Sequence, residues 1–249
     1  MKVYCFGEKE KPVIFLFPGT CCHWKGNFGK VIEPLEEYFR VACVSYDGFD
    51  ETEQTEFPTM TEETEKIEQY IKKEFGGHIC AAYGCSLGGS FVGLLAARGN
   101  IHMEYGILGG SDLDQSGKFL AKLMTKLMMP VFYPFIANGE MKIPFMKKKM
   151  DKMLAEDNGY IRAFMDMIKT PDVDMSHITK RSVENQFTQT SLHRCRIRST
   201  RPERRYIFYM PLKWVKNIVR VTKNILQDRS CMNWICSTKN CLRFIRMIG

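Results

Sequence analysis

The segment Gly84–Gly88 has the sequence Gly-Cys-Ser-Leu-Gly and lies between an apolar run and a stretch of small and apolar residues. The run His78–Tyr83 is typical of a buried strand, and Phe91–Leu95 is typical of a buried helix. At such a strand-to-helix turn, a serine flanked by glycines can hold its hydroxyl clear of the sheet, because larger side chains at the glycine positions would collide. The sequence therefore predicts a strained turn that exposes the hydroxyl of Ser86.

This arrangement resembles the nucleophile elbow of the α/β-hydrolase family, whose motif is Gly-x-Ser-x-Gly. The resemblance implies that Ser86 is a nucleophile that forms an acyl-enzyme intermediate. It also implies two backbone amides that bind the oxyanion: one belongs to Leu87, and the other to the loop after an early strand, here Thr20 or Cys21. The alternative interpretation of Pro18–Thr20 is an ordinary turn that closes a buried strand.

Strand and helix patterns alternate through the first part of the chain. The helix before the Gly84–Gly88 turn has a capping-box spacing at Thr59 and Glu62 and ends at Gly76 and Gly77. The alternation predicts an α/β fold with a mainly parallel sheet flanked by helices, which binds ligands at the carboxyl ends of its strands. The predicted strands are Lys2–Phe6, Val13–Phe17, Arg40–Tyr46, His78–Tyr83 and Tyr105–Leu108, and the predicted helices include Phe28–Phe39 and one that ends at Arg98.

Between Ser116 and Met175 the pattern changes to helices without strands. We predict an inserted helical cap at about residues 116–175, within an α/β-hydrolase core of residues 1–187. Lys118, Lys122 and Lys126 would share one helix face, a spacing that fits either a membrane-surface helix or a solvated cap helix. The predicted cap helices are Phe119–Met129, Phe145–Leu154 and Tyr160–Ile168, with interruptions at Pro130, Pro134 and Pro144.

In the family, a carboxylate and a histidine complete the catalytic triad. The segment after the strand that follows the elbow makes Asp112 the first candidate for the acid and Asp114 the second. The alternative is that these carboxylates cap the first helix of the cap. The histidine of the family lies late in the chain, and none of the five histidines has that position. His23 follows the oxyanion loop, and we interpret it as a satisfied side chain at the pocket rather than a relocated base. The other four are His78, His102, His177 and His193.

The charge distribution changes abruptly near Phe187. Residues 1–187 contain 22 Lys and Arg against 26 Asp and Glu, whereas residues 188–249 contain 14 against 2. Ten of the 14 arginines also lie in residues 188–249, although the preceding part prefers lysine. Only Arg205–Met210 and Leu212–Leu226 in this basic tail have spacing typical of a strand or a helix. The charge and composition of residues 188–249 therefore differ from those of residues 1–187.

A frameshift directly after Phe187 would explain both the basic tail and the absence of a late histidine. Overlapping codons limit what a neighbouring frame can encode, and codons compatible with Asn233–Cys241 permit the string LDMQHEEL once one upstream base is restored. Codons compatible with the rest of the tail also permit a strand-like IYFLYAL and place the histidine in a late acidic loop, where the resemblance implies it, although codon degeneracy leaves other readings open. The alternative is a genuine basic tail that binds nucleic acid or an anionic surface.

The cysteines and the apolar segments restrict the cofactors and the location. Adjacent Cys21 and Cys22, and late cysteines spaced five residues apart without nearby histidines, fit neither a disulfide framework nor a zinc site. The apolar segments are too short to cross a membrane, and the residues after Met1 lack the apolar run of a signal peptide. We therefore expect a cytoplasmic protein without a transmembrane segment, a metal or another cofactor.

Together these features predict a capped serine hydrolase of the esterase, lipase-like or thioesterase-like kind. It would act on a small-molecule acyl substrate through an acyl-Ser86 intermediate. Activity would be weak or absent because the late histidine is missing. The alternative function is a noncatalytic hydrolase-fold protein that binds anionic partners through Arg194–Arg205. Nucleic acid is not an expected partner, because these arginines are not interleaved with aromatic residues.

Overall fold

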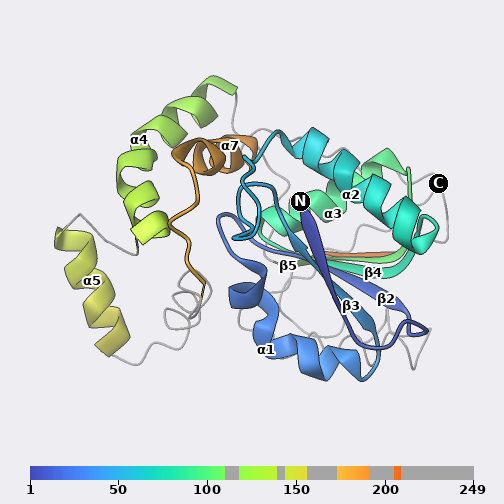
Figure 1. Cartoon of the computed structure of the whole chain (residues 1–249). Coiled ribbons are helices and arrows are strands. Elements are labelled where there is room, and N and C mark those ends of the chain that lie inside the picture. Colours follow the sequence, from blue (N-terminus) through green and yellow to red (C-terminus); the bar gives the residue numbers. More distant parts are fainter. Residues whose placement is uncertain (110–117, 139–143, 156–172, 191–204, 209–249) are drawn as a thin grey trace.

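A computed structural model describes residues 1–109, 118–138, 144–155, 173–190 and 205–208 (Figure 1). Within these residues one sheet has the strand order β1-β3-β2-β4-β5-β6, in which β1 is antiparallel to β3 and the other pairs are parallel. The predicted mainly parallel α/β fold is therefore confirmed. The strands are β1 (Lys2–Phe6), β2 (Val13–Phe17), β3 (Arg40–Ser45), β4 (His78–Cys85), β5 (His102–Gly109) and β6 (Arg205–Phe208).

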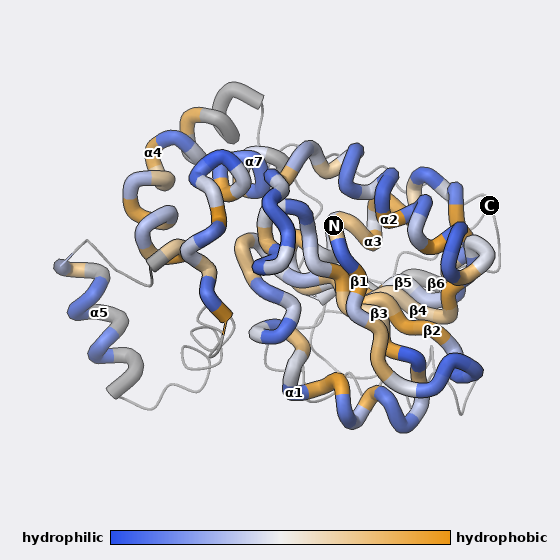
Figure 2. The backbone as a smooth tube through the Cα atoms, viewed as in Figure 1, coloured by the Kyte–Doolittle hydropathy of each residue, from blue (hydrophilic) through white to orange (hydrophobic). Residues whose placement is uncertain are grey.

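Helices cover both faces of the sheet (Figure 1). α1 (Trp24–Glu36) packs on one face, and α2 (Met60–Phe75) and α3 (Leu87–Arg98) pack on the other. Buried Phe28 and Leu35 join α1 to its face of the sheet. Figure 2 shows that hydrophobic residues concentrate on the strands, whereas hydrophobic and hydrophilic residues alternate along α1 and α2. This distribution is expected of strands buried on both faces and of helices with one face in solvent.

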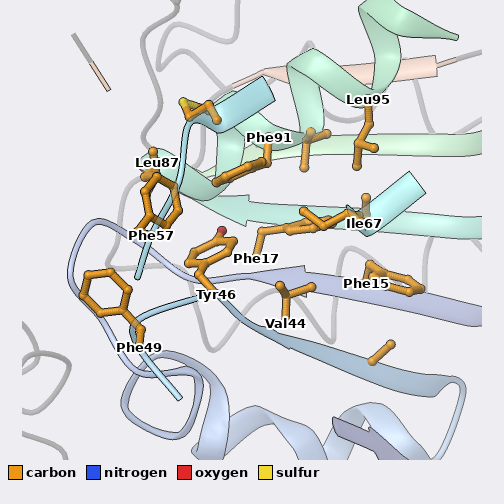
Figure 3. Close-up of a cluster of buried hydrophobic side chains, with 14 of the residues drawn as sticks. Phe15, Phe17, Val44, Tyr46, Phe49, Phe57, Ile67, Leu87, Phe91 and Leu95 are labelled. Atoms are coloured by element: carbon orange, nitrogen blue, oxygen red, sulfur yellow. The ribbon is translucent and has the colours of Figure 1, made fainter. Parts of the chain in front are cut away.

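A cluster of aromatic side chains fills the core near the carboxyl ends of the strands (Figure 3). Tyr46 stacks on Phe91 with ring centroids 4.8 Å apart, and Phe57 meets Phe91 edge to face at 6.4 Å. The side chain of Leu87, the first residue of α3, lies in the same cluster and is fully buried. The start of α3 is thus held against the sheet by close packing.

The predicted ends of α2 are confirmed. Thr59 and Glu62 form the capping box, in which each side chain bonds the backbone N–H of the other residue. Gly76 adopts the left-handed conformation with φ 61°, and the N–H of Gly77 donates to the carbonyl oxygen of Ile71 at 3.1 Å. A glycine is suited to position 76, at the end of α2, because it has no Cβ to oppose a positive φ.

Two other elements begin earlier than predicted. α1 begins at Trp24 rather than Phe28, because His23 serves as the N-cap and its side chain accepts a hydrogen bond from the N–H of Lys25. β5 begins at His102 rather than Tyr105, because His102 and Met103 pair in register with the first two residues of β4. In both cases a contact between residues outweighs the local hydrophobic pattern.

The predicted breaks at Pro130 and Pro134 are wrong. α4 (Lys118–Asn138) continues through both prolines, and its Phe132 packs against Phe187 of α7 (Lys180–Thr190) with ring centroids 5.6 Å apart. Tertiary packing of this kind outweighs the loss of single intrahelical hydrogen bonds. Pro144 is the first residue of α5 (Pro144–Ala155), where a proline is favourable because no intrahelical N–H bond is needed there. The predicted helix Tyr160–Ile168 lies outside the described residues.

The chain after Phe187 contributes two described pieces. α7 continues to Thr190, and Arg205–Phe208 forms β6, which pairs in parallel with β5 and aligns Ile207 with Ile107. β6 lies within Arg205–Met210, one of the two parts of the tail with regular spacing. The boundary at residue 187 and the cap at about residues 116–175 stay predictions.

Candidate active site

Ser86 occupies the turn between β4 and α3. Its backbone has φ 50° and ψ −112°, a combination that side-chain-bearing residues adopt at a cost. Ser86 is exposed, whereas Cys85 and Leu87 on either side of it are buried. Its N–H donates to the carbonyl oxygen of Gly109 at 2.8 Å, and its carbonyl oxygen accepts from the N–H of Gly89 at 2.9 Å. The strained conformation is therefore held by the end of β5 and by the first turn of α3.

The two glycines of the motif are required by close backbone contacts. A Cβ on Gly84 would lie 2.1 Å from the carbonyl carbon and oxygen of Gly88. A Cβ on Gly88 would lie 2.0 Å from the carbonyl oxygen of Phe17, at the end of β2. Both distances are far below van der Waals contact, and both contacts are to backbone atoms that a rotamer change cannot move away. The packing of α3 against β2 and β4 thus explains why glycines flank Ser86.

The amide of Leu87 has the properties of an oxyanion donor. Leu87 is the first residue of α3, and the first N–H groups of a helix have no intrahelical partner. The partial positive charge at a helix N-terminus also favours an anion beside this amide. The side chain of Leu87 is buried in the core, which fixes the peptide that carries the N–H.

The predicted oxyanion loop lies beside the Ser86 turn. A Cβ on Gly19 would lie 3.5 Å from the carbonyl oxygen of Cys85, so the two backbones are close. The N–H of Gly19 donates to Oδ1 of Asn27 at 2.7 Å, and the hydroxyl of Tyr46 donates to the carbonyl oxygen of Pro18 at 3.1 Å. The loop is therefore tied to both α1 and the end of β3.

The side chain of Gln186 in α7 accepts a hydrogen bond from the backbone amide of Cys21. The N–H of Cys21 donates to Oε1 of Gln186 at 2.7 Å, and both residues are buried. Cys21 also has a positive φ of 56°, so its strained peptide is held by this contact. Of the two predicted loop donors, Cys21 already has an acceptor, whereas no such acceptor is seen for the Thr20 amide within the described residues.

Two further hydrogen bonds join α7 to Phe57, which lies in the segment before α2. The N–H of Phe57 donates to Oγ of Ser182 at 3.0 Å, and Nδ2 of Asn185 donates to the carbonyl oxygen of Phe57 at 2.7 Å. These contacts span more than a hundred residues of sequence. Neither they nor the Gln186 contact produces a local signal in the sequence, so sequence reasoning missed all three residues of α7.

His23 is a buried, satisfied histidine. Its Nδ1 accepts from the N–H of Lys25 at 3.3 Å, and its Nε2 lies 2.9 Å from Oε2 of Glu51. Burial lowers the pKa of His23, although the Glu51 carboxylate opposes this shift. The neutral ring therefore donates from Nε2 and accepts at Nδ1, which leaves no nitrogen free to take a proton from Ser86. This agrees with its interpretation as a satisfied side chain.

Among the described residues, no hydrogen bond joins a histidine to Ser86. His78 and His102 lie at the amino-terminal starts of β4 and β5, at the opposite end of the strand from Ser86, and His78 pairs with Glu104 at 3.0 Å. His177 lies before α7, where its Nδ1 is 2.9 Å from the carbonyl oxygen of Asp174. His193 and the predicted acids Asp112 and Asp114 lie outside the described residues.

The cysteines around the turn are buried thiols with raised pKa values. Burial raises the pKa of Cys85 to about 11, and burial also raises that of Cys22, whose Sγ lies 3.3 Å from the carbonyl oxygen of Thr20. Both are protonated thiols at neutral pH, and a thiol is a far weaker nucleophile than a thiolate. Ser86 is exposed at the turn, whereas both of these thiols are buried.

The described part of the chain contains no group of three or more His, Cys, Asp or Glu side chains arranged to hold a metal ion. Within the same residues, no helix combines the length and the apolar character needed to cross a membrane.

No protein-family model and no curated protein sequence matches the chain. Solved structures, by contrast, match it over most of its length. A hydrolase from Pseudomonas aeruginosa PA01 matches with a TM-score of 0.66 at 14% identity, over 91% of this chain and 94% of that one. A thermophilic esterase from Thermogutta terrifontis, with malate bound, gives 0.60 at 13% identity, over 94% and 92%. An enol-lactonase from Burkholderia xenovorans LB400 gives 0.59 at 13% identity, over 90% and 94%.

The chain therefore has the α/β-hydrolase fold, as the Gly84–Gly88 motif predicted. Identities this low establish the architecture alone, because one fold supports many reactions. The reaction must be argued from Ser86 and the groups around it.

Proposed function

We propose that this chain descends from serine hydrolases that cleave acyl substrates through an acyl-Ser86 intermediate. The observation that carries the proposal is the exposed Ser86 on a strained turn, with the Pro18–Thr20 segment beside it. The fold is one in which hydrolases, esterases and a lactonase occur. The substrate class is a small-molecule ester or thioester, and the α4 and α5 region would be the cap that selects it.

In the proposed reaction, Oγ of Ser86 forms a bond to the acyl carbon while the carbonyl π electrons move onto oxygen. The N–H groups of Leu87 and Thr20 would stabilise this oxyanion. We assign Thr20 rather than Cys21, because the Cys21 amide is occupied by Gln186. The intermediate then expels an alcohol or thiol, and water releases the acid from Ser86.

The proton of Ser86 needs a base during attack, and Asp112 would orient that base. The described residues contain no histidine bonded to Ser86, and His23 has both ring nitrogens engaged. We infer that the base was lost through a frameshift after Phe187, so that turnover by this chain is weak or absent. The free thiols of the described residues fit a cytoplasmic location.

Labelling with a fluorophosphonate tests the nucleophile and the lost base together. The chain as it stands, its Ser86→Ala variant and the protein translated from the restored frame are treated side by side. We expect rapid labelling of the restored protein at Ser86 and slow or no labelling of the other two. Equal labelling of the original and restored proteins would show that no base was lost.

Sequencing of the encoding DNA tests the frameshift independently of activity. We expect a reading frame that resumes a hydrolase-like sequence after one base is restored downstream of codon 187. A frame in which no single-base change after Phe187 yields such a sequence would contradict the frameshift. In that case the noncatalytic alternative, with Arg194–Arg205 as an anion-binding segment, becomes the better account.

A further inference from the structure

His78 and His102 lie side by side at the amino-terminal ends of β4 and β5. The two residues pair in the parallel register, and the backbone N–H of His102 donates to the carbonyl oxygen of Gly77 at 2.8 Å. Their rings have centroids 4.6 Å apart and planes inclined by 77°. The paired strands therefore hold the two imidazoles next to each other.

The carboxylate of Glu104 orients one of these rings. Nε2 of His78 lies 3.0 Å from Oε1 of Glu104. A carboxylate only accepts hydrogen bonds, so Nε2 carries the proton and Nδ1 has the lone pair of the neutral ring. Neither Nδ1 of His78 nor the ring of His102 has a hydrogen-bond partner among the described residues. A histidine that donates one ring N–H to a carboxylate and keeps its other nitrogen free has the arrangement typical of a metal ligand.

The spacing of the two rings suits a shared metal ion. A ring nitrogen about 2.1 Å from an ion places the centroid of its ring about 3.2 Å from that ion, so two rings bound at a right angle have centroids about 4.6 Å apart. The observed distance between the centroids of His78 and His102 is 4.6 Å. Right angles between ligands are typical of tetragonal sites for Ni²⁺ or Cu²⁺ with nitrogen and oxygen ligands.

The histidine pair is accessible to ions from solvent. The side chain of His78 is 56% exposed and that of Glu104 is 42% exposed. Only the two histidines would bind the ion directly, in keeping with the absence of a three-ligand group among the described residues. A surface ion pair between His78 and Glu104 needs no second imidazole, so it does not explain the position of His102.

We propose that His78 and His102 form a surface site for a divalent transition-metal ion such as Ni²⁺. Nδ1 of His78 and one ring nitrogen of His102 bind the ion, Glu104 orients the His78 ring and offsets part of the positive charge, and water completes the coordination. The sequence predicted no metal, because only the register of β4 and β5 brings the two histidines together. The site lies at the opposite end of β4 from Ser86 and is independent of the reaction proposed there.

Calorimetric titration of the full chain with Ni²⁺ tests the site. Loss of the carboxylate that orients a ligating histidine typically lowers metal affinity about 10–100-fold, so E104A is expected to weaken binding about tenfold or more. H78Q and H102Q each remove a ligand and are expected to weaken it at least as much. H177Q is the matched control, because His177 lies before α7 and outside the pair, and it should leave the affinity unchanged. Circular dichroism checks that each variant is folded.

Chemical protection distinguishes this site from thiols elsewhere in the chain, which also bind metal ions. Diethyl pyrocarbonate acylates free imidazole nitrogens, and peptide mass spectrometry locates the modified histidines. We expect Ni²⁺ to protect His78 and His102 from the reagent and to leave the modification of His177 unchanged. If H78Q and H102Q bind Ni²⁺ as tightly as the original chain, the ion binds elsewhere and the proposal is wrong. Absence of Ni²⁺ binding by the original chain would also overturn it.

Discussion

Gly88 shows how little room the Ser86 turn leaves for a side chain. A Cβ at this position would lie 2.0 Å from the carbonyl oxygen of Phe17, so Gly88→Ala must push α3 away from β2. We expect a loss of about 3 kcal/mol in the free energy of unfolding, measured by urea denaturation, because the clash is with backbone. Gly29→Ala is the control: Gly29 lies within α1 and a Cβ there meets nothing within 4 Å. This control is expected to stabilise the protein by about 0.5–1 kcal/mol. Similar stability of the two variants would contradict the close packing.

Glu63 is a buried carboxyl group whose charge is unfavourable. Burial and the neighbouring Asp47 carboxylate raise its pKa to about 7, although Lys66 and the Met1 amino group oppose the shift. Its Oε1 accepts from the N–H of Asp47 at 2.9 Å, a bond that glutamine can keep.

Because the pKa of Glu63 is higher in the folded chain than in the unfolded chain, the free energy of unfolding falls as pH rises from the unfolded-state pKa of 4.5 through the folded-state pKa of about 7. Glu63→Gln should therefore match the original chain near pH 4 and exceed it by about 1–3 kcal/mol near pH 8. Urea denaturation across this pH range measures the difference, with Glu74→Gln, an exposed residue of the same helix, as the control. A difference that does not vary with pH would rule out titration of Glu63.

At the scale of elements, α7 connects a distant part of the chain to the predicted oxyanion loop through Gln186. Gln186→Met has similar length but no acceptor, so the Cys21 N–H would stay buried without its 2.7 Å partner. We expect a cost of about 1–3 kcal/mol in stability and faster hydrogen exchange at Cys21. Glu184→Gln, at a half-exposed position on the same helix whose carboxylate pairs with Lys180, should change neither. Unchanged exchange at Cys21 would show that Gln186 does not hold the loop.

The sequence predicted the elements whose signals are local. The capping box at Thr59, the glycine end at Gly76 and the turn at Ser86 each depend on residues a few positions apart, and each was found. The continuation of α4 through Pro130 was missed, because it depends on packing against α7. The Gln186 contact was missed for the same reason: Cys21 and Gln186 are 165 residues apart, and no periodicity links them.

For the whole molecule, the proposed frameshift after Phe187 places all of residues 188–249 in another reading frame, and one part of this tail, β6, nevertheless completes the sheet. β6 pairs with β5 along Tyr105–Leu108, where Ile107 and Leu108 are almost completely buried. A chain that ends at Thr190 lacks β6 and leaves β5 as an unprotected edge. We expect this truncation to lose about 2–4 kcal/mol of stability and to aggregate.

A chain that ends at Phe208 is the matched comparison, since it keeps every described element and removes only residues 209–249. Because the described part of the chain that packs into the sheet and helices ends at Phe208, we expect the loss of residues 209–249 to leave the urea midpoint nearly unchanged. Their loss also removes positive charge, so the shorter protein should bind less to a cation-exchange resin while keeping its stability. A large fall in the urea midpoint on removing residues 209–249 would instead show that these residues contribute to the folded domain.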